Sequence, residues 1–464
     1  MAHIVNDAGN GSSNAIARGL KEALFAAVIA LGMFVLFVGI KTDQNMANEL
    51  IWYTRWGLLA IFVAIAAGGR FLVVAFIGPH LDRRKLAKAK SGIPEISAEK
   101  GFFHAHFLKI ALIALLLYPP VMMWLAGVQG SLKYIDKFGI QILIYVMLAW
   151  GLNIVVGLAG LLDLGYVAFY AVGAYSYALL SQYGLSFWVL LPLSGILAAF
   201  WGIILGFPVL RLRGDYLAIV TLAFGEIIRL VLINWTAVTK GTFGISGIPK
   251  ASVFGIWSFD VGAANNFAKA FALPMSSAYY KFFLFYLALA LCMLTAYVTI
   301  RLRRMPIGRA WEALREDEIA CRSLGINTVT TKLTAFAIGA MFGGFAGSFF
   351  AARQGFVSPE SFVFLESAVI LAIVVLGGMG SLTGIAVAAV LMVGGTELLR
   401  EMQFLKAVFG PDFTPELYRM LLFGLAMIIV MLFKPRGFVG SREPTAFLKE
   451  KKAVSGSFTK EGHG

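Results

Sequence analysis

Long stretches without a charged residue constrain this chain more than any other feature. They run from Ala23 to Ile40, Phe138 to Leu162, Leu164 to Leu210, Phe282 to Ile300, Leu333 to Ala352 and Ser367 to Thr396. A helix needs roughly 20 apolar residues to cross about 30 Å of hydrocarbon. Several stretches are that long, and two are long enough to fold back. Because a membrane β-barrel shows alternation in segments of about ten residues, the pattern predicts an all-α, polytopic helical bundle.

Composition and charge support the membrane assignment. Of the 464 residues, 59% are hydrophobic and only 14% are charged, whereas soluble domains carry about 25% charged residues. The net charge of +14 does not indicate a nucleic-acid partner, because Lys and Arg concentrate beside apolar spans in segments 79–106, 301–332 and 434–464. Basic segments in these positions are typical of cytoplasmic loops.

The order of apolar and basic segments predicts ten to twelve crossings. We place twelve near residues 20–40, 57–78, 107–126, 138–158, 166–183, 187–210, 216–235, 281–302, 333–352, 362–376, 385–403 and 417–434. Alternation then puts both termini and all three basic segments in the cytoplasm. We expect a two-helix membrane extension with a basic linker at 1–105, a membrane core at 106–440 and a polar cytoplasmic tail at 441–464. The first apolar run is too long for a signal-peptide core, so it should stay as an anchor.

Two glycine-rich segments interrupt the apolar stretches, at residues 157–165 and 377–384. As one helix, the uncharged stretch around the second break would extend about 45 Å and overshoot the bilayer, so the break predicts two crossings. Irregular backbone at membrane depth is tolerated only inside protein or beside a wet cavity. Asp163, Gly378 and Ser381 are therefore candidates for a translocation path, and a plain helix-turn-helix at each break is the alternative.

Several chemistries lack their usual residues. No G-x-x-x-x-G-K-[ST] phosphate loop occurs, so ATP-driven transport would need a hydrolysing site on another chain. All five histidines lie outside the apolar spans, which removes the commonest ligand or base of intramembrane metalloenzymes and proton relays. Carboxylates in the spans are few, which counts against an ion-coupled carrier. We expect no bound metal.

The segment 301–327 predicts an amphipathic helix between two spans. Pro306 and Gly308 end one helix, and Gly325 suits a C-terminal cap. Trp311, Leu314, Cys321 and Leu324 fall at 0, 3, 10 and 13, on one apolar face. The segment is either an interfacial helix or a cytosolic docking helix that enters a groove on an ATP-hydrolysing subunit.

Other candidate residues lie in the spans and in one long loop. Glu226 and Arg229 are three apart on one helix and can pair, either to fix packing or to line a polar path. Tyr166, Tyr170 and Tyr177 form one helical stripe, which is typical of packing and also suits the lining of a path through the membrane. The long loop 236–277 should face the periplasm, either as a docking surface with Thr242, Phe243 and Ile245 as candidate partner contacts or as a structured lid with no partner. Small-residue motifs at 202–206 and 339–347 predict close helix contacts.

Five blocks of sequence resemble the LivM-type permease subunits of bacterial ABC importers for branched-chain amino acids. They are Gly308 to Thr334, Gly157 to Leu180, Arg211 to Glu226, Gly241 to Pro249 and Val375 to Gly384. The similarity covers roughly residues 107–440, and the two-helix extension fits LivM-type better than the shorter LivH-type chains. The chain departs from the general importer signature Glu-Ala-Ala-x-x-x-Gly, because Ile319 stands where the signature has glutamate and Glu318 is one place early.

The resemblance implies a subunit of an ATP-driven importer that moves Leu, Ile or Val from the periplasm into the cytoplasm across the bacterial inner membrane. It implies a LivH-like second permease, two ATP-binding subunits that carry ATP and Mg²⁺, and a periplasmic binding protein. This chain would hold no cofactor and catalyse no reaction. The residues that we expect to couple it to the ATPase are Arg309, Trp311, Leu314, Arg315, Glu316, Glu318, Arg322 and Gly325. A stand-alone ion-coupled carrier and an intramembrane enzyme are the alternatives.

Overall fold

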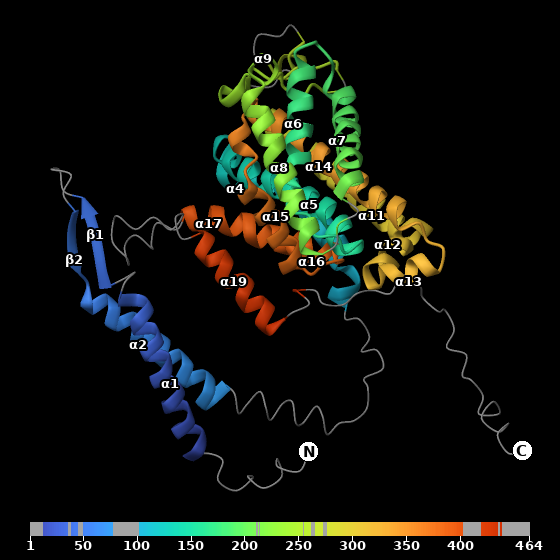
Figure 1. Cartoon of the computed structure of the whole chain (residues 1–464). Helices are drawn as coiled ribbons and strands as arrows, with labels where there is room; N and C mark the ends of the chain where they lie inside the picture. The colour runs from blue at the N-terminus through green and yellow to red at the C-terminus, as the bar shows by residue number, and fades with distance from the viewer. Residues whose placement is uncertain are drawn as a thin grey trace, which may run out of the picture. The chain divides into compact units, whose positions relative to one another are not determined.

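The computed structural model describes residues 13–35, 39–44, 50–77, 102–209, 214–253, 255–260, 265–271, 276–401 and 419–434, together with 212, 437 and 438. The chain forms two compact units, Met1–Phe107 (unit 1) and Leu108–Gly464 (unit 2) (Figure 1). Most of the predicted linker 79–106 and the whole predicted tail 441–464 lie outside the described residues. The expected domain boundaries therefore stay a prediction.

Unit 1 holds two packed helices and a hairpin. Helix α1 (Ser13–Phe34) packs against α2 (Trp56–Leu72), which continues as the π-helical segment η2 (Val73–Ile77). Between them, β1 (Ile40–Gln44) pairs antiparallel with β2 (Leu50–Thr54). The hairpin was not predicted. Helix α1 ends at Phe34, Val35 and Gly39 are π-helical, and β1 begins at Ile40, where the predicted span ends. Polar residues 41–44 cannot continue an apolar span, and their backbone groups pair across strands instead.

The first arm of unit 2 is one long helical run. It consists of α4 (Phe102–Tyr134), η3 (Ile135–Ile140), α5 (Gln141–Leu152) and η4 (Asn153–Leu158). Gly127, at φ 70° and ψ 172°, divides α4 into two helices. The break falls where the predicted crossing 107–126 ends, and the chain is helical again directly after Gly127, before the next predicted crossing begins at 138. The carboxylate of Asp136 in η3 is neutralised by Lys281 and Arg353, with N···O distances of 2.8 and 2.9 Å.

The core of unit 2 is a set of three helices in backbone contact, α6 (Val167–Ser181), α7 (Phe187–Val209) and α14 (Thr328–Gln354). A Cβ atom added at Gly173 of α6 would lie 2.7 Å from the carbonyl carbon of Gly344 in α14. One added at Gly202 of α7 would lie 2.7 Å from Ala340 Cβ. Small residues let these helices approach closely, which confirms the predicted small-residue contacts.

The remaining elements connect and cover this core. They are α8 (Asp215–Asn234), α9 (Thr236–Thr239), η5 (Gly241–Phe243), β3 (Ile245–Ser246), α10 (Phe267–Ala270), α11 (Ala278–Arg304), α12 (Pro306–Glu316), α13 (Glu318–Ser323), β4 (Phe356–Val357), η6 (Pro359–Ser361), α15 (Phe364–Gly377), α16 (Leu382–Ala389), η7 (Val390–Gly394), α17 (Gly395–Glu401) and α19 (Arg419–Phe433). Strands β3 and β4 pair antiparallel, with Ile245 opposite Val357.

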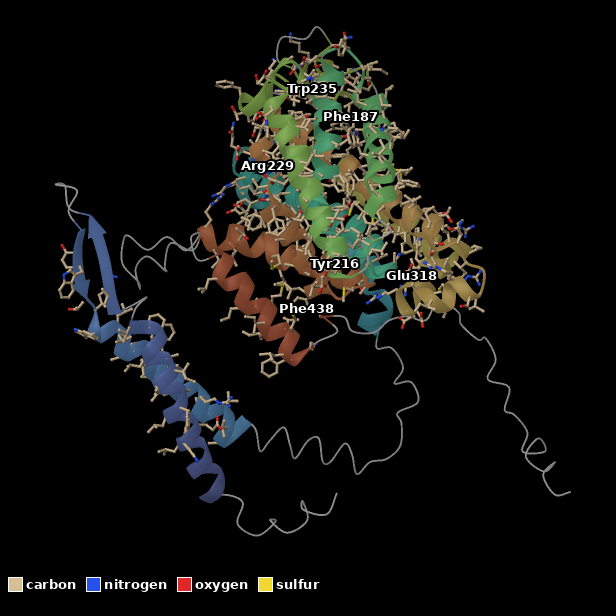
Figure 2. The ribbon with its side chains drawn as sticks, in the orientation of Figure 1. Phe187, Tyr216, Arg229, Trp235, Glu318 and Phe438 are labelled. Atoms are coloured by element: carbon tan, nitrogen blue, oxygen red, sulfur yellow. The ribbon has the colours of Figure 1, made fainter. Side chains whose placement is uncertain are left out.

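The two ends of unit 2 carry different structures. Figure 2 shows Trp235, which follows α8, at one end and Glu318 of α13 at the other. We call these the loop end and the docking end. Tyr216 at the start of α8 lies toward the docking end, so α8 runs from the docking end to the loop end.

Eight helices among the described residues are long and apolar enough to cross a membrane. They are Trp56–Ala75, Ala111–Leu158, Phe187–Val209, Asp215–Asn234, Ala278–Arg304, Thr328–Gln354, Pro359–Gly377 and Leu382–Arg400. Ala111–Leu158 contains two predicted crossings, and Val167–Ser181 and Gly424–Phe433 are apolar but shorter. The chain is a polytopic helical membrane protein, as predicted, and the exact number of crossings stays a prediction.

Candidate functional site

The docking segment, residues 306–325, starts with a fixed turn after α11. Pro306 occupies the first turn of α12, where its missing N–H costs nothing. Gly308 lies against the end of α11, since an added Cβ would be 2.5 Å from Arg303 Cα. Arg303 Nε also donates to Glu312 Oε1 over 2.7 Å. These contacts set the angle at which α12 leaves α11.

The inward face of the docking segment is anchored to α14. The Trp311 side chain is fully buried, and its Nε1 donates to the Thr331 carbonyl over 3.0 Å and to Thr334 Oγ1 over 3.2 Å. Leu314 and Cys321 are buried as well. Three of the four residues predicted on one apolar face are therefore buried, and Trp311 bonds to the first turns of α14.

The single amphipathic helix predicted in the segment 301–327 is wrong, because the segment holds two helices, α12 and α13. Asp317 adopts an extended conformation between α12 and α13, and its carboxylate accepts from the backbone N–H groups of Ile319 and Ala320. A side chain that caps a helix start stabilises a new helix there, so the chain turns at Asp317. The turn takes Leu324 off the apolar face, and that side chain is 80% exposed. Gly325, at φ 82°, follows α13 as predicted.

Glu318 connects α13 to α14 through an ion pair that the sequence did not indicate. Its Oε1 lies 3.0 Å from Lys332 Nζ, and the Lys332 side chain is only 5% exposed. The same oxygen lies 3.3 Å from Arg322 Nη2 at the surface. A buried ammonium needs such a partner. Glu318 therefore neutralises Lys332 within its own chain.

The outward face of the docking segment combines charges with exposed apolar side chains. Ile319, at the position of the signature glutamate, is 67% exposed, and Met305 and Val329 at the margins are also exposed. Arg309, Glu316, Arg322 and Gly325 lie exposed along the same segment. We call Ile319 and Leu324 the outward pair. Sequence reasoning missed Ile319, although a large apolar residue in a run of charges was a signal.

Arg315 turns away from the outward face. Its Nη1 donates to the carbonyl oxygen of Gly157, at the first glycine-rich break. The second break lies beside the first, because the backbone N–H of Gly380 donates to Asn153 Oδ1 over 2.8 Å. Gly378, at φ 98°, ends α15, and Ser381 caps α16 by accepting from Gly384 N over 3.1 Å. Both breaks therefore meet the docking segment at the docking end.

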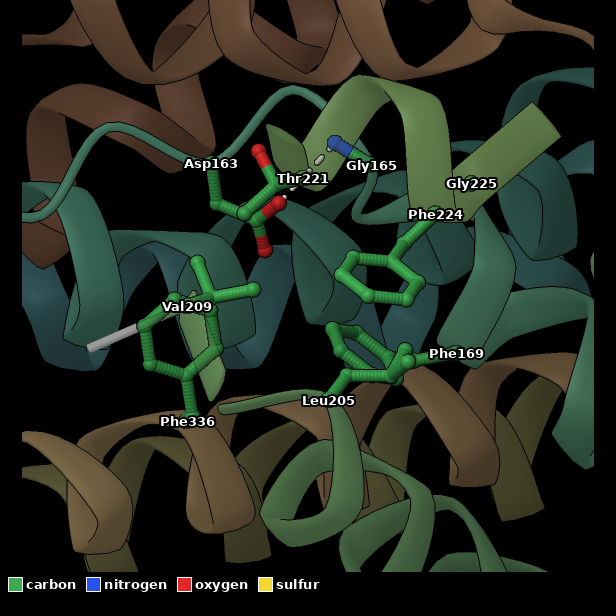
Figure 3. A pocket seen from close by; sticks show the side chains of 9 residues that line it. All are labelled: Asp163, Gly165, Phe169, Leu205, Val209, Thr221, Phe224, Gly225 and Phe336. Carbon is green, nitrogen blue, oxygen red and sulfur yellow. Dashed lines mark hydrogen bonds between the residues drawn. The ribbon is translucent and has the colours of Figure 1, made fainter. Parts of the chain in front are cut away.

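Asp163 is buried in the connection between η4 and α6. Its Oδ1 accepts from Gly165 N over 2.9 Å, while its Oδ2 has no hydrogen-bond partner among the residues that the structure describes. Burial raises the pKa of Asp163 to about 6 against the opposing effect of the Gly165 hydrogen bond. The carboxyl borders a small cavity that Phe169, Leu205, Val209, Phe224 and Phe336 line with apolar surface (Figure 3).

The tyrosine stripe lies inside the chain. Tyr166 donates to the Gly339 carbonyl over 2.8 Å, and Tyr177 donates to the Pro249 carbonyl over 3.3 Å. Tyr170 packs edge-on against Phe362, with ring centroids 5.2 Å apart. All three side chains are buried. This arrangement favours the packing interpretation over contact with a transported molecule.

Glu226 and Arg229 form the predicted pair on α8, with Nη2 3.0 Å from Oε1. Arg229 Nη1 also lies 3.5 Å from Glu360 Oε1. The Glu226 and Glu360 side chains are partly or largely exposed on this face, whereas Tyr170 and Asp163 are buried. Figure 2 places Arg229 between the two ends of the bundle. Charges at membrane depth are costly against lipid and are found facing a bundle interior or a wet cavity.

Of the three predicted contacts in the long loop, two are available at the surface. Phe243 is 87% exposed on η5, and Thr242 beside it is exposed. Ile245 is fully buried because β3 pairs with β4, so it is removed from the contact candidates. Exposed Trp235 lies at the same end.

Comparisons with known proteins identify a family for this chain. The model of the family described as branched-chain amino acid transport system / permease component matches residues 134–431, and a domain of unknown function matches residues 18–118. The comparison with solved structures gave no match.

Three curated relatives illustrate the similarity. The high-affinity branched-chain amino acid transport system permease protein LivM of Salmonella typhimurium is 50% identical over 93% of this chain and 97% of its own length. LivM of Escherichia coli is 53% identical over 67% of this chain and 71% of its own. The permease protein LivH of Salmonella typhimurium is 27% identical over 64% of this chain and 92% of its own.

Proposed function

The chain belongs to the family of branched-chain amino acid permease components, and from this premise we propose that it moves Leu, Ile or Val through the bacterial inner membrane as one pore-forming subunit of an ATP-driven importer. Both LivM and LivH proteins of one organism resemble the chain. That similarity supports a LivH-like subunit as its partner in the membrane. The chain itself transports and does not catalyse.

The docking segment is the proposed contact with an ATPase subunit. The observation that carries this proposal is the exposure of Ile319 and Leu324 in a segment too charged to enter lipid. Large apolar side chains exposed to water in this way mark protein contact sites. Two ATPase subunits with their ATP and Mg²⁺ would bind from this side, and this chain needs no cofactor of its own.

The charged face of α8 is the proposed side of the translocation path. Glu226, Arg229 and Glu360 are paired but not buried. Exposing these charged side chains to lipid would cost free energy. This face therefore suits contact with a neighbouring permease subunit, or with water between the two subunits. A zwitterionic amino acid could then pass beside paired charges rather than through hydrocarbon.

The two ends of unit 2 fit opposite sides of the membrane. Arg301, Arg303 and Arg304 end α11 at the docking end, which fits the cytoplasm. Phe438, the last residue that the structure describes, lies at the docking end too, and we propose that both termini are cytoplasmic. The loop end would then face the periplasm, with exposed Thr242 and Phe243 as contacts for a periplasmic binding protein.

Reconstituted transport tests this function. We expect ATP-dependent leucine uptake by proteoliposomes that hold this chain, a LivH-like subunit, ATPases and binding protein. The double variant Ile319→Asp, Leu324→Asp should reduce uptake to background, because charge would disrupt an apolar contact. Tyr183→Asp, at an exposed position outside the docking segment, is the matched control and should leave co-purification with the ATPases unchanged, whereas the double variant should lose it. Gradient-driven uptake by this chain alone would instead establish an ion-coupled carrier.

A further inference from the structure

Arg315 is built into the membrane part of the chain. In addition to the bond from Nη1 to the Gly157 carbonyl, the stem of Arg315 fills a bend in the first break. A Cβ atom added at Gly160 would lie 2.7 Å from Arg315 Cγ and 3.3 Å from its Cα. Gly160 also has φ 72°, a conformation that favours glycine. The break is therefore folded around this side chain.

The second break meets the same place. A Cβ atom added at Gly157 would lie 2.8 Å from Gly380 N, and one added at Gly380 would lie 4.0 Å from Arg315 Nη1. The hydrogen bond from Gly380 N to Asn153 Oδ1 fixes the two breaks together. The guanidinium thus lies where the docking-end termini of α5 and α15 come together.

A third segment closes onto this junction from the C-terminal side. Phe438 N donates to the Leu376 carbonyl over 2.9 Å. A Cβ atom added at Gly437 would lie 2.5 Å from Gly378 N. Three backbone segments that are far apart in the sequence are therefore in direct contact beside one side chain of the docking segment.

The helix next to the junction is already distorted. Asn153 begins the π-helical segment η4, and π-helical turns are frequent at functional sites. Asn153 Nδ2 is buried and has no hydrogen-bond partner among the described residues. A buried donor without a partner raises the free energy of the arrangement that holds it. An arrangement of the junction that gives Asn153 Nδ2 a partner would regain this free energy.

We propose that Arg315 is a positioning residue that connects the docking segment to the two glycine-rich breaks. Movement of α12 by a bound ATPase subunit would be transmitted through Arg315 to the docking-end termini of α5 and α15. Without this connection, the ATPase would still hydrolyse ATP, but the two glycine-rich breaks would not move with α12. The inference rests on the proposed function, because it requires an ATPase on the outward pair.

The first test separates coupling from docking. In the full complex, Arg315→Ala should co-purify with the ATPases and hydrolyse ATP, but leucine taken up per ATP should fall by roughly tenfold, as for loss of a hydrogen bond from a charged donor. Arg315→Lys, which keeps a charged donor, should recover part of this ratio. A residue that only maintains the fold would lower assembly, hydrolysis and uptake together.

A second pair of variants changes the first glycine-rich break rather than Arg315. Gly160→Ala places a methyl group against the Arg315 stem, whereas Gly184→Ala has the same kind of left-handed backbone, at φ 79°, with no described atom within 4 Å of the added Cβ. Both carry similar backbone strain. We expect only Gly160→Ala to lower the ratio of uptake to hydrolysis.

The outcomes are distinguishable. If Arg315→Ala loses the ATPases as the double variant of the outward pair does, Arg315 is a docking contact and the inference is wrong while the proposed function survives. A wild-type ratio in Arg315→Ala, or equal ratios in the two glycine variants, also overturns it. If the outward-pair variant keeps both ATPase binding and uptake, the docking proposal itself is wrong.

Discussion

Two regions of unit 2 are held together by opposite means. Helices α6, α7 and α14 meet at backbone level through glycines such as Gly173 and Gly344, with no space for another atom. The docking segment is instead attached by individual side chains, to α14 through Trp311 and Glu318 and to the first break through Arg315. The first region fixes the membrane fold. The second depends on few bonds, so single substitutions should change its attachment while the bundle stays folded.

The largest expected effect lies in the glycine-packed helices. Gly173→Leu should yield no folded chain, because the backbone of Gly344 cannot move without displacing all of α14. Gly395→Leu is the matched control, since no described atom lies within 4 Å of its added Cβ. The measurement is the fraction of monodisperse protein recovered in detergent. Folded Gly173→Leu protein would show that the close contact is not required.

Trp311→Ala should have the next largest effect. Truncating a buried aromatic side chain costs about 3–5 kcal/mol, here concentrated where the docking segment meets α14. We expect protease cleavage within residues 306–325 at temperatures where the remaining helices are still protected. Trp201→Ala, at a partly exposed position of α7, serves for comparison. Cleavage throughout the chain would mean that the two regions are not separable.

A smaller effect should distinguish the two ion pairs of Glu318. Glu318→Ala leaves the buried Lys332 without this partner and should cost about 1–3 kcal/mol. Arg322→Ala removes only the surface pair and should cost less than about 1 kcal/mol. The measurement is the midpoint of thermal unfolding of each variant in detergent. Equal midpoints would show that Lys332 does not depend on Glu318.

The smallest effect on stability is expected on the outward face. Ile319→Ser exposes no new cavity and should change the free energy of unfolding by less than about 0.5 kcal/mol. It should nevertheless weaken co-purification with an ATPase subunit. A large loss of stability in the isolated chain would indicate that Ile319 packs within its own fold.

The membrane fold was predictable because its signal is local. Uncharged stretches, basic flanks and small-residue spacing each lie within one helix or loop. The turn at Asp317 had a local signal too, since Asp is a strong helix cap. The apolar spacing across 311–324 indicated one continuous helix instead. The hairpin at 40–54 was not predicted, because residues 41–56 lie between two apolar stretches and carry no signal for a membrane crossing.

The junction around Arg315 could not be predicted. Gly157, Arg315 and Gly380 are brought together from three distant parts of the chain, and spacing along one helix says nothing about such contacts. The same holds for Asp136, whose partners Lys281 and Arg353 lie on other helices. The glycine-rich breaks are visible in the sequence, and only packing shows which charged side chain lies beside them.

Site-specific photo-cross-linking in the assembled complex tests the docking surface most directly. A photoreactive residue at Leu324 should form a cross-link with an ATPase subunit, while one at Phe243, at the loop end, should form none with it. A Leu324 adduct with a periplasmic protein, or an ATPase adduct at Phe243, would contradict the account.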